Sequence, residues 1–137
     1  MTEYDMALEP KTVGDMAQEY AKAWSSHSPE AVASFYVEDG KITINNGDPI
    51  VGRVAIAEMA QGFYNEFPNL VIHLDDVRLA GSHAIFVWTL EGTHSETGNY
   101  VKVGGWEEWT LSDDNRVSES LGWFDAADYD RQVAGDG

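Results

Sequence analysis

The chain has 137 residues, no cysteine, and a formal net charge of −16 from 24 acidic and 8 basic side chains. This length suits one domain over residues 1–137, and the lack of cysteine excludes disulfides and thiolate metal sites. The negative charge argues against nucleic-acid binding because it repels phosphate groups. Since neither a signal peptide nor an apolar run of about 18 residues is visible, we expect a cytoplasmic protein without membrane contact.

The first half of the chain is predicted to be mainly helical. Residues 1–11 are expected to be a loose lead-in, followed by a helix from Thr12 in which apolar residues recur at helical spacing. Ser28 is placed to cap a second helix that starts at the next residue, a proline. A short strand over residues 41–45 and a third helix within residues 52–68 complete this half.

The second half changes to a period of two. The segments "NLVIHLDDVRLA", "HAIFVWTLEGTH", "NYVKVGGWEEWTL" and "RVSESLGWFD" are four predicted strands separated by polar turns. The segment "AADYDRQVAG" predicts a short last helix before a frayed tail over residues 134–137. Helices followed by strands favour an α+β fold, with the helices on one face of a curved antiparallel sheet and a pocket at its open mouth.

The segment "GWEEW" places two glutamates side by side in a strand, where neighbours point to opposite faces. The face of Glu107 also carries Val103 and Trp109 and is otherwise apolar. The face of Glu108 is mixed and carries Lys102. We therefore expect Glu107 to lie inside and Glu108 to face solvent, unless a bulge at the preceding Gly-Gly pair exchanges the two faces.

The two neighbouring strands supply further candidates for the pocket. The apolar face of "HAIFVWTLEGTH" ends in His94, so a hairpin with the next strand is expected to bring His94 near Glu107 at the mouth. Alternation in the last strand puts Glu119 and Trp123 on the inner face. The expected pocket residues are Tyr20, Trp24, Trp88, Trp109, Glu119 and Trp123, although the tryptophans also suit ordinary core packing.

The chemistry predicted for this site is acid–base catalysis. Burial raises the pKa of a carboxylate, and a base poised nearer neutrality is suited to removing a proton next to a carbonyl. His94 could donate a proton to the developing enolate oxygen, and Tyr20 could add a hydrogen bond. The alternative is that Glu107 and His94 form only a structural pair. His73 and Asp75 alternate on one face, but two ligands are a weak metal signal, so neither metal nor cofactor is expected.

Four segments resemble the SnoaL-like polyketide cyclase branch of the nuclear-transport-factor-2-like superfamily. They are "AWSSHSPEAVASFYVEDGKI", "GDPIVGRVAIAEMAQGFYNEFPNL", "VWTLEGTH" and "GGWEEWTLSDDNRVSESLGWFDAADYDRQ", and the similarity spans about residues 13–133. The resemblance implies a cone-shaped α+β barrel, usually a homodimer formed through the outer sheet face. It also implies an acidic residue and a His as the acid–base pair of a cofactor-free ring closure, at the positions of Glu107 and His94.

This sequence departs from the family pattern in one respect, because Glu107 stands where the cyclases carry Asp. Ketosteroid isomerases and limonene epoxide hydrolases fit less well, since their Asp base and their arginine are missing here. The leading hypothesis is a cyclase- or isomerase-like enzyme acting on a hydrophobic, carbonyl-bearing, polyketide-like molecule. The alternatives are a non-catalytic ligand-binding or dimerisation domain with the same pocket, and hydratase or dehydratase chemistry with the same residue pair.

Overall fold

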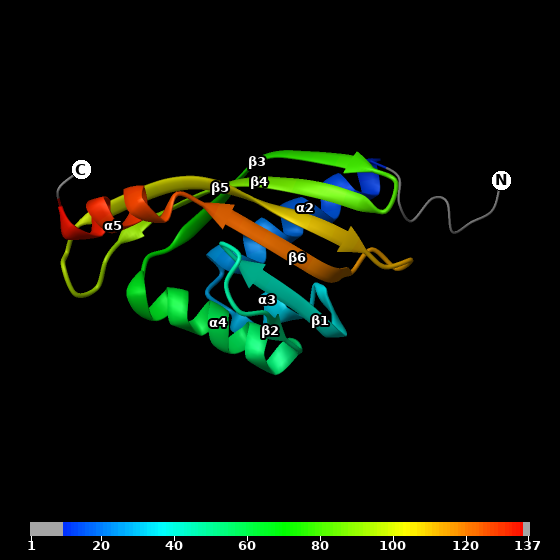
Figure 1. Ribbon diagram of the computed structural model, residues 1–137, viewed down its shortest axis with the longest axis horizontal. Helices are drawn as coiled ribbons and strands as arrows, with labels where there is room; N and C mark the ends of the chain where they lie inside the picture. The colour runs from blue at the N-terminus through cyan, green and yellow to red at the C-terminus, as the bar shows by residue number, and fades with distance from the viewer. Residues whose placement is uncertain (1–9, 136–137) are drawn as a thin grey trace.

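A computed structural model describes residues 10–135 of the protein and contains helices around one sheet (Figure 1). In chain order the elements are α2 (Pro10–Ser25), α3 (Pro29–Ala33), β1 (Tyr36–Ile44), β2 (Ile50–Val51), α4 (Arg53–Glu66), β3 (Val71–Ala80), β4 (His83–Thr93), β5 (Tyr100–Leu111), β6 (Val117–Phe124) and α5 (Ala126–Ala134). Every helix and strand predicted from the sequence is present, and β2 is an addition.

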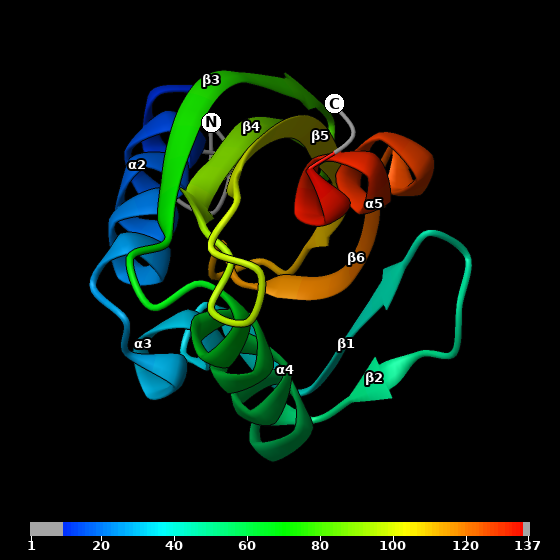
Figure 2. The ribbon, with the colours of Figure 1, turned by 90° about the vertical axis from the view of Figure 1, so that its left-hand side faces the viewer.

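The six strands form one sheet in the order β2-β1-β6-β5-β4-β3. All neighbours are antiparallel except β1 and β6, which run parallel. Figure 2 shows β3 to β6 curling in an arc, with α2 beside β3 at one side and α4 below. The helix α2 packs against β3, α3 packs against α4, and α5 packs against β5. The predicted α+β fold with a curved sheet around the N-terminal helices is therefore confirmed.

Three predicted boundaries need correction. The expected lead-in over residues 1–11 is too long, because α2 already begins at Pro10, where proline is well tolerated at a first helical position; residues 1–9 lie outside the described part. The first strand begins at Tyr36, ahead of residues 41–45, and its pairing with β6 shifts register between Tyr36 and Lys41. At the tail, α5 includes Ala134 and Gly135 caps it with a φ of 85°, while residues 136–137 lie outside the description.

The alternation predicted for β5 is confirmed along its length. The residues of one face between Val101 and Trp109, Gly105 and Glu107 among them, are buried, whereas the residues that alternate with them are exposed. The β4–β5 pairing is continuous through Gly105, so the bulge considered at the Gly-Gly pair does not occur. In β4 and β5, the residues on the inner face of the sheet are therefore those that the sequence predicts.

The alternation predicted for β6 is wrong because the bulge lies there. Thr110 pairs with Glu119 but Leu111 pairs with Val117, so β6 carries one extra residue, Ser118. A one-residue bulge exchanges the two faces of a strand. As a result Ser120 is fully buried, whereas Glu119 lies outside, with its side chain 40% exposed and 3.7 Å from Lys41 Nζ.

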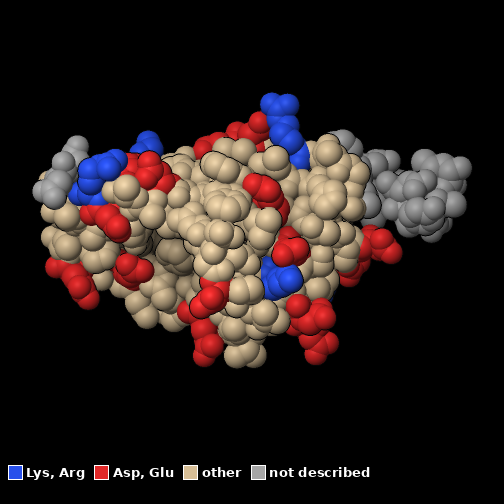
Figure 3. Space-filling model, in the orientation of Figure 1, with Lys and Arg blue, Asp and Glu red and all other residues tan. Residues whose placement is uncertain are grey.

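Trp123 follows Glu119 to the outer face, where it lies directly across from the exposed Trp106. On the face drawn in Figure 3, acidic side chains are scattered over a mostly uncharged surface and outnumber the few basic ones. No helix of the described residues is both long and apolar enough to cross a membrane.

Candidate functional site

The curved sheet and the helices enclose a cavity of about 610 Å³, its open mouth included. The lining residues are Trp24, Ile42, Ile44, Met59, Phe63, Ile72, Phe86, Trp88, Leu90, Val103, Glu107, Gly122, Phe124 and Tyr129. Among these described residues Glu107 supplies the single carboxylate, so a charged group borders an otherwise apolar space.

The carboxylate of Glu107 is 7% exposed and is held mainly through one of its two oxygens. Oε1 accepts hydrogen bonds from Trp109 Nε1 at 2.8 Å, Ser120 Oγ at 2.8 Å, Tyr20 Oη at 3.2 Å and Tyr36 Oη at 3.4 Å. Oε2 accepts only from Tyr20, at 3.3 Å, among the described groups. Oε2 is therefore the oxygen with capacity for a further partner.

These contacts come from four separate elements. Tyr20 is on α2, Tyr36 begins β1, Ser120 is on β6, and Trp109 follows Glu107 on the same face of β5. The ring of Tyr20 meets Trp109 edge to face at 5.3 Å between centroids, so the tyrosine is fixed by packing as well as by its hydroxyl. The inward position of Ser120 depends on the β6 bulge.

Burial dominates the electrostatics of the site. It raises the pKa of Glu107 above its usual 4.5, and the hydrogen bonds from Trp109, Ser120, Tyr20 and Tyr36 offset part of that effect. Burial, and then the negative charge of Glu107, also raise the pKa values of Tyr20 and Tyr36 well above 10. Both tyrosines therefore stay neutral and act as donors. Their hydroxyls are also 2.9 Å apart, so one of them shares its single proton between the other hydroxyl and Glu107.

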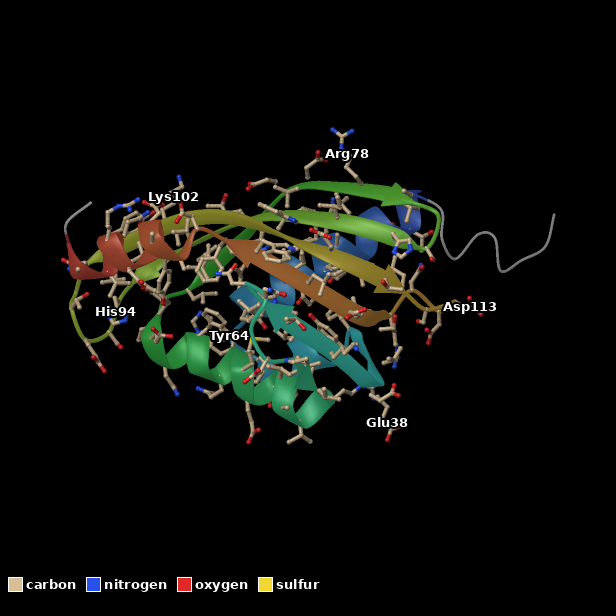
Figure 4. All side chains as sticks on the ribbon, viewed as in Figure 1. Glu38, Tyr64, Arg78, His94, Lys102 and Asp113 are labelled. Atoms are coloured by element: carbon tan, nitrogen blue, oxygen red, sulfur yellow. The ribbon has the colours of Figure 1, made fainter. Side chains whose placement is uncertain are left out.

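The predicted pairing of Glu107 with His94 is wrong. Glu107 pairs with Phe86 across the β4–β5 hairpin, and the stretch from Phe86 to Thr93, which precedes His94, spans roughly 20 Å of strand at about 3.3 Å per residue. In Figure 4, His94 lies near α5, at the end of the molecule where β4 ends. The hairpin turn already implied this separation, because residues equidistant from a turn pair with each other.

His94 instead belongs to a cluster at the rim of the cavity. Its Nε2 lies 3.5 Å from Glu66 Oε1, which also accepts a hydrogen bond from Tyr129 Oη at 3.1 Å. The imidazole packs edge to face on Phe67, with 5.4 Å between ring centroids. Since Tyr129 lines the cavity, this cluster joins α4, α5 and the end of β4 around the mouth.

The other predicted site residues divide into three groups. Trp24 and Trp88 line the cavity as expected. Tyr20 and Trp109 are buried behind Glu107 and bind its carboxylate without bordering the cavity. Glu119 and Trp123 are outside it, as described above.

Two functional contacts were missed in the sequence. Tyr36, at the start of β1, was not among the expected pocket residues, and the alternation that placed Glu119 inward left Ser120 on the outer face. The described residues contain no group of three or more His, Asp or Glu side chains that could hold a metal ion. His73 and Asp75 bond to Glu91 and Thr89 respectively.

A family model for the SnoaL-like domain matches residues 17–120, most of the chain. The protein belongs to the SnoaL-like domain family. No curated protein sequence matches the chain. Solved structures do, and their low sequence identities make them a guide to the fold of this SnoaL-like protein.

Three of these structures illustrate the range of the fold. A putative SnoaL-like polyketide cyclase from Jannaschia sp. CCS1 is 15% identical, with a TM-score of 0.81 over 93% of this chain and 94% of its own. A Catenulispora acidiphila protein with a ketosteroid isomerase-like fold, in complex with trimethylamine, is 15% identical, with a TM-score of 0.81 over 88% and 92%. A putative polyketide cyclase from Xanthomonas campestris is 20% identical, with a TM-score of 0.75 over 88% and 96%.

Proposed function

We propose that this SnoaL-like protein binds a hydrophobic, carbonyl-bearing, polyketide-like molecule in its cavity and that Glu107 is the general base acting on it. The observation that carries the proposal is the position of Glu107, a buried carboxylate on the wall of an apolar cavity, with Oε1 saturated by donors and Oε2 nearly free. Relatives named as polyketide cyclases support the substrate class.

In this mechanism Oε2 takes a proton from the carbon next to the substrate carbonyl. The electron pair of the broken C–H bond moves onto the carbonyl oxygen and forms an enolate. The enolate either attacks a second carbonyl to close a ring, and the resulting alkoxide takes the proton from Glu107, or, where a conjugated double bond extends it to a dienolate, takes that proton back at the far carbon. The charge of Glu107 is lost as the proton arrives. The desolvation that raises its pKa therefore favours the transfer, and the donors on Oε1 fix the orientation of the carboxylate throughout.

A test of the base requires no natural substrate. 2-Tetralone is a hydrophobic ketone whose α-hydrogens exchange with deuterium in D₂O, and this exchange can be followed by NMR. We expect the wild-type protein to accelerate the exchange and Glu107→Gln to lower the rate by about 100-fold or more, the usual contribution of a positioned base. Glu108→Gln is the matched control, because Glu108 is the neighbouring carboxylate on the exposed face.

Equal exchange rates for wild type and Glu107→Gln would overturn the assignment of Glu107. Binding of the ketone by Glu107→Gln, measured by thermal shift, separates loss of chemistry from loss of the pocket.

A non-catalytic binding domain is the second candidate function. It is favoured by one observation. The only titratable side chains in the described lining are Glu107 and Tyr129, and the Tyr129 hydroxyl already donates to Glu66, so the lining offers no further side chain to act as a partner acid. In that case the protein would be stabilised by hydrophobic ligands but would leave 2-tetralone exchange unchanged.

The assembly and location of the protein form part of the same proposal. We propose a homodimer through the outer face of the sheet, where Ile85 and Trp106 are each 42% exposed, and a cytoplasmic site of action consistent with a chain without cysteine. Analytical ultracentrifugation of the wild type and of Trp106→Glu would test the dimer. A monomeric wild type would contradict it.

A further inference from the structure

The indole of Trp88 presents a hydrogen-bond donor with no use inside the protein. Trp88 lines the cavity, and its Nε1 is buried without a hydrogen-bond partner among the described residues. A buried N–H group that lacks a partner costs about 1–3 kcal/mol, so such groups are rare unless they serve a purpose. A ligand with an acceptor oxygen would remove this cost.

The fold turns the N–H edge of this indole toward the strand that carries Glu107. A Cβ atom built on Gly105 would lie 2.5 Å from Trp88 Cζ2 and 2.7 Å from Cη2, so this edge of the ring lies directly over the glycine. Cζ2 is bonded to the ring carbon that also carries Nε1, so the N–H is on the same side. Only glycine leaves room for this placement on β5.

Trp88 and Glu107 are diagonal neighbours on the inner face of the sheet. Trp88 pairs with Gly105, and Phe86, the next inward residue on β4, pairs with Glu107. The Cα atoms of diagonal neighbours are about 7–8 Å apart, within reach of aromatic and long side chains. The two residues that carry an unpartnered donor and a carboxylate oxygen with spare capacity therefore line the same apolar cavity as neighbours.

We propose that Trp88 Nε1 donates a hydrogen bond to the carbonyl oxygen of the ligand and so presents the neighbouring carbon to Glu107 Oε2. Trp88 is then a specificity-determining residue that selects ketones over hydrocarbons of the same shape. The inference deepens the proposed function and rests on the same cavity. It assigns the recognition of the carbonyl to a side chain that the proton transfer itself does not require.

Trp123 provides a matched control within the same chain. Its Nε1 is also buried without a partner among the described residues, but Trp123 lies on the outer face of the sheet and does not line the cavity. Trp88→Phe and Trp123→Phe each remove one unpartnered N–H and keep an aromatic ring. Only the first changes the wall of the cavity.

The experiment compares two probes of similar shape, 2-acetylnaphthalene and 2-ethylnaphthalene, by equilibrium dialysis. For each protein the ratio of the two dissociation constants isolates the carbonyl from the packing of the ring. We expect Trp88→Phe to shift this ratio against the ketone by about fivefold, the effect of one hydrogen bond, and Trp123→Phe to leave it unchanged. The carbonyl stretching frequency of the bound ketone should be lower in the wild type than in Trp88→Phe.

Equal ratios in all three proteins would overturn the inference, as would the absence of binding of either probe to the wild type. A failure of the proposed function would give a different pattern in the two experiments. If Glu107→Gln leaves 2-tetralone exchange unchanged while Trp88→Phe still loses the preference for the ketone, then the recognition stands and the base assignment fails.

Discussion

Glu107 lies in the wall of the cavity and Glu66 lies outside the lining, next to Tyr129, and each carboxylate accepts a hydrogen bond from a tyrosine hydroxyl. Glu107 is buried and is bonded to Tyr20 and Tyr36, whereas at the rim the side chain of Glu66 is 48% exposed and is bonded to Tyr129. The two share a tyrosine partner but differ in exposure and in their other neighbours, which are Trp109 and Ser120 at Glu107 and His94 at Glu66. Because desolvation raises the pKa of a carboxyl group, burial rather than the choice of partner prepares Glu107 for proton transfer.

The difference in exposure between Glu107 and Glu66 should also determine how much each carboxylate contributes to the stability of the fold. The buried carboxylate is the shared acceptor for donors from α2, β1, β5 and β6, so its removal strands several buried polar groups at once. If a half-exposed carboxylate is removed, water can take its place as the hydrogen-bond acceptor for the donors that remain. The deep cluster is therefore expected to be part of the folded core, and the rim cluster to be dispensable.

The largest expected effect comes from removing each carboxylate in turn. Glu107→Ala should lower the free energy of unfolding by about 3–5 kcal/mol, because it leaves buried donors without an acceptor and opens a void. Glu66→Ala should lower it by less than about 1 kcal/mol, as is typical of exposed pairs. Urea denaturation measures both values, and similar losses would contradict the contrast between the two carboxylates.

A smaller effect is expected from the hydroxyl that the β6 bulge turns inward. Ser120→Ala removes a 2.8 Å donor from Glu107 and should cost about 1–2 kcal/mol of stability. Since this hydrogen bond lowers the pKa of Glu107, its loss should also move the pH midpoint of 2-tetralone exchange upward. Ser118→Ala is the control, because its hydroxyl bonds to the Thr110 carbonyl instead. An unchanged midpoint in Ser120→Ala would show that the Ser120 hydroxyl does not influence the protonation of Glu107.

The smallest effect concerns the pH dependence of stability. The pKa of Glu107 is higher in the folded protein than its usual 4.5, so its contribution to stability is fully present below that value and is lost as pH rises through the folded pKa. The melting temperature of the wild type should therefore fall relative to that of Glu107→Gln as pH rises across this window. Parallel curves for the two proteins would show that the pKa of Glu107 is not raised.

The sequence was sufficient for much of this fold. Helical spacing, caps and a period of two placed the helices and the long strands, because burial imposes those periods locally. The same alternation placed Glu107 inside and Glu108 outside without knowledge of any distant contact. The SnoaL-like resemblance agreed with the fold.

The failures share one physical origin, which is register. Alternation identifies the face of a strand but not the position along it, so His94 was placed on the correct face and at the wrong end. A bulge leaves no clear trace in composition, so Glu119 and Trp123 were assigned inward and Ser120 outward. Tyr36 was missed because its role depends on a contact with Glu107, which is distant in the chain.

The extra residue in β6 also has a consequence for how this protein family could diversify. If Ser118 paired with Thr110 in a regular ladder, the stretch that follows would turn over, and the inner face now built from Ser120, Gly122 and Phe124 would present Glu119, Leu121 and Trp123. Loss of the bulge at constant strand length would thus give the inner face an acidic and a bulky residue without replacing any amino acid after Ser118. Deletion of Ser118, in contrast, would keep Glu119 and Ser120 opposite Thr110 and Trp109 and would preserve the present inner face.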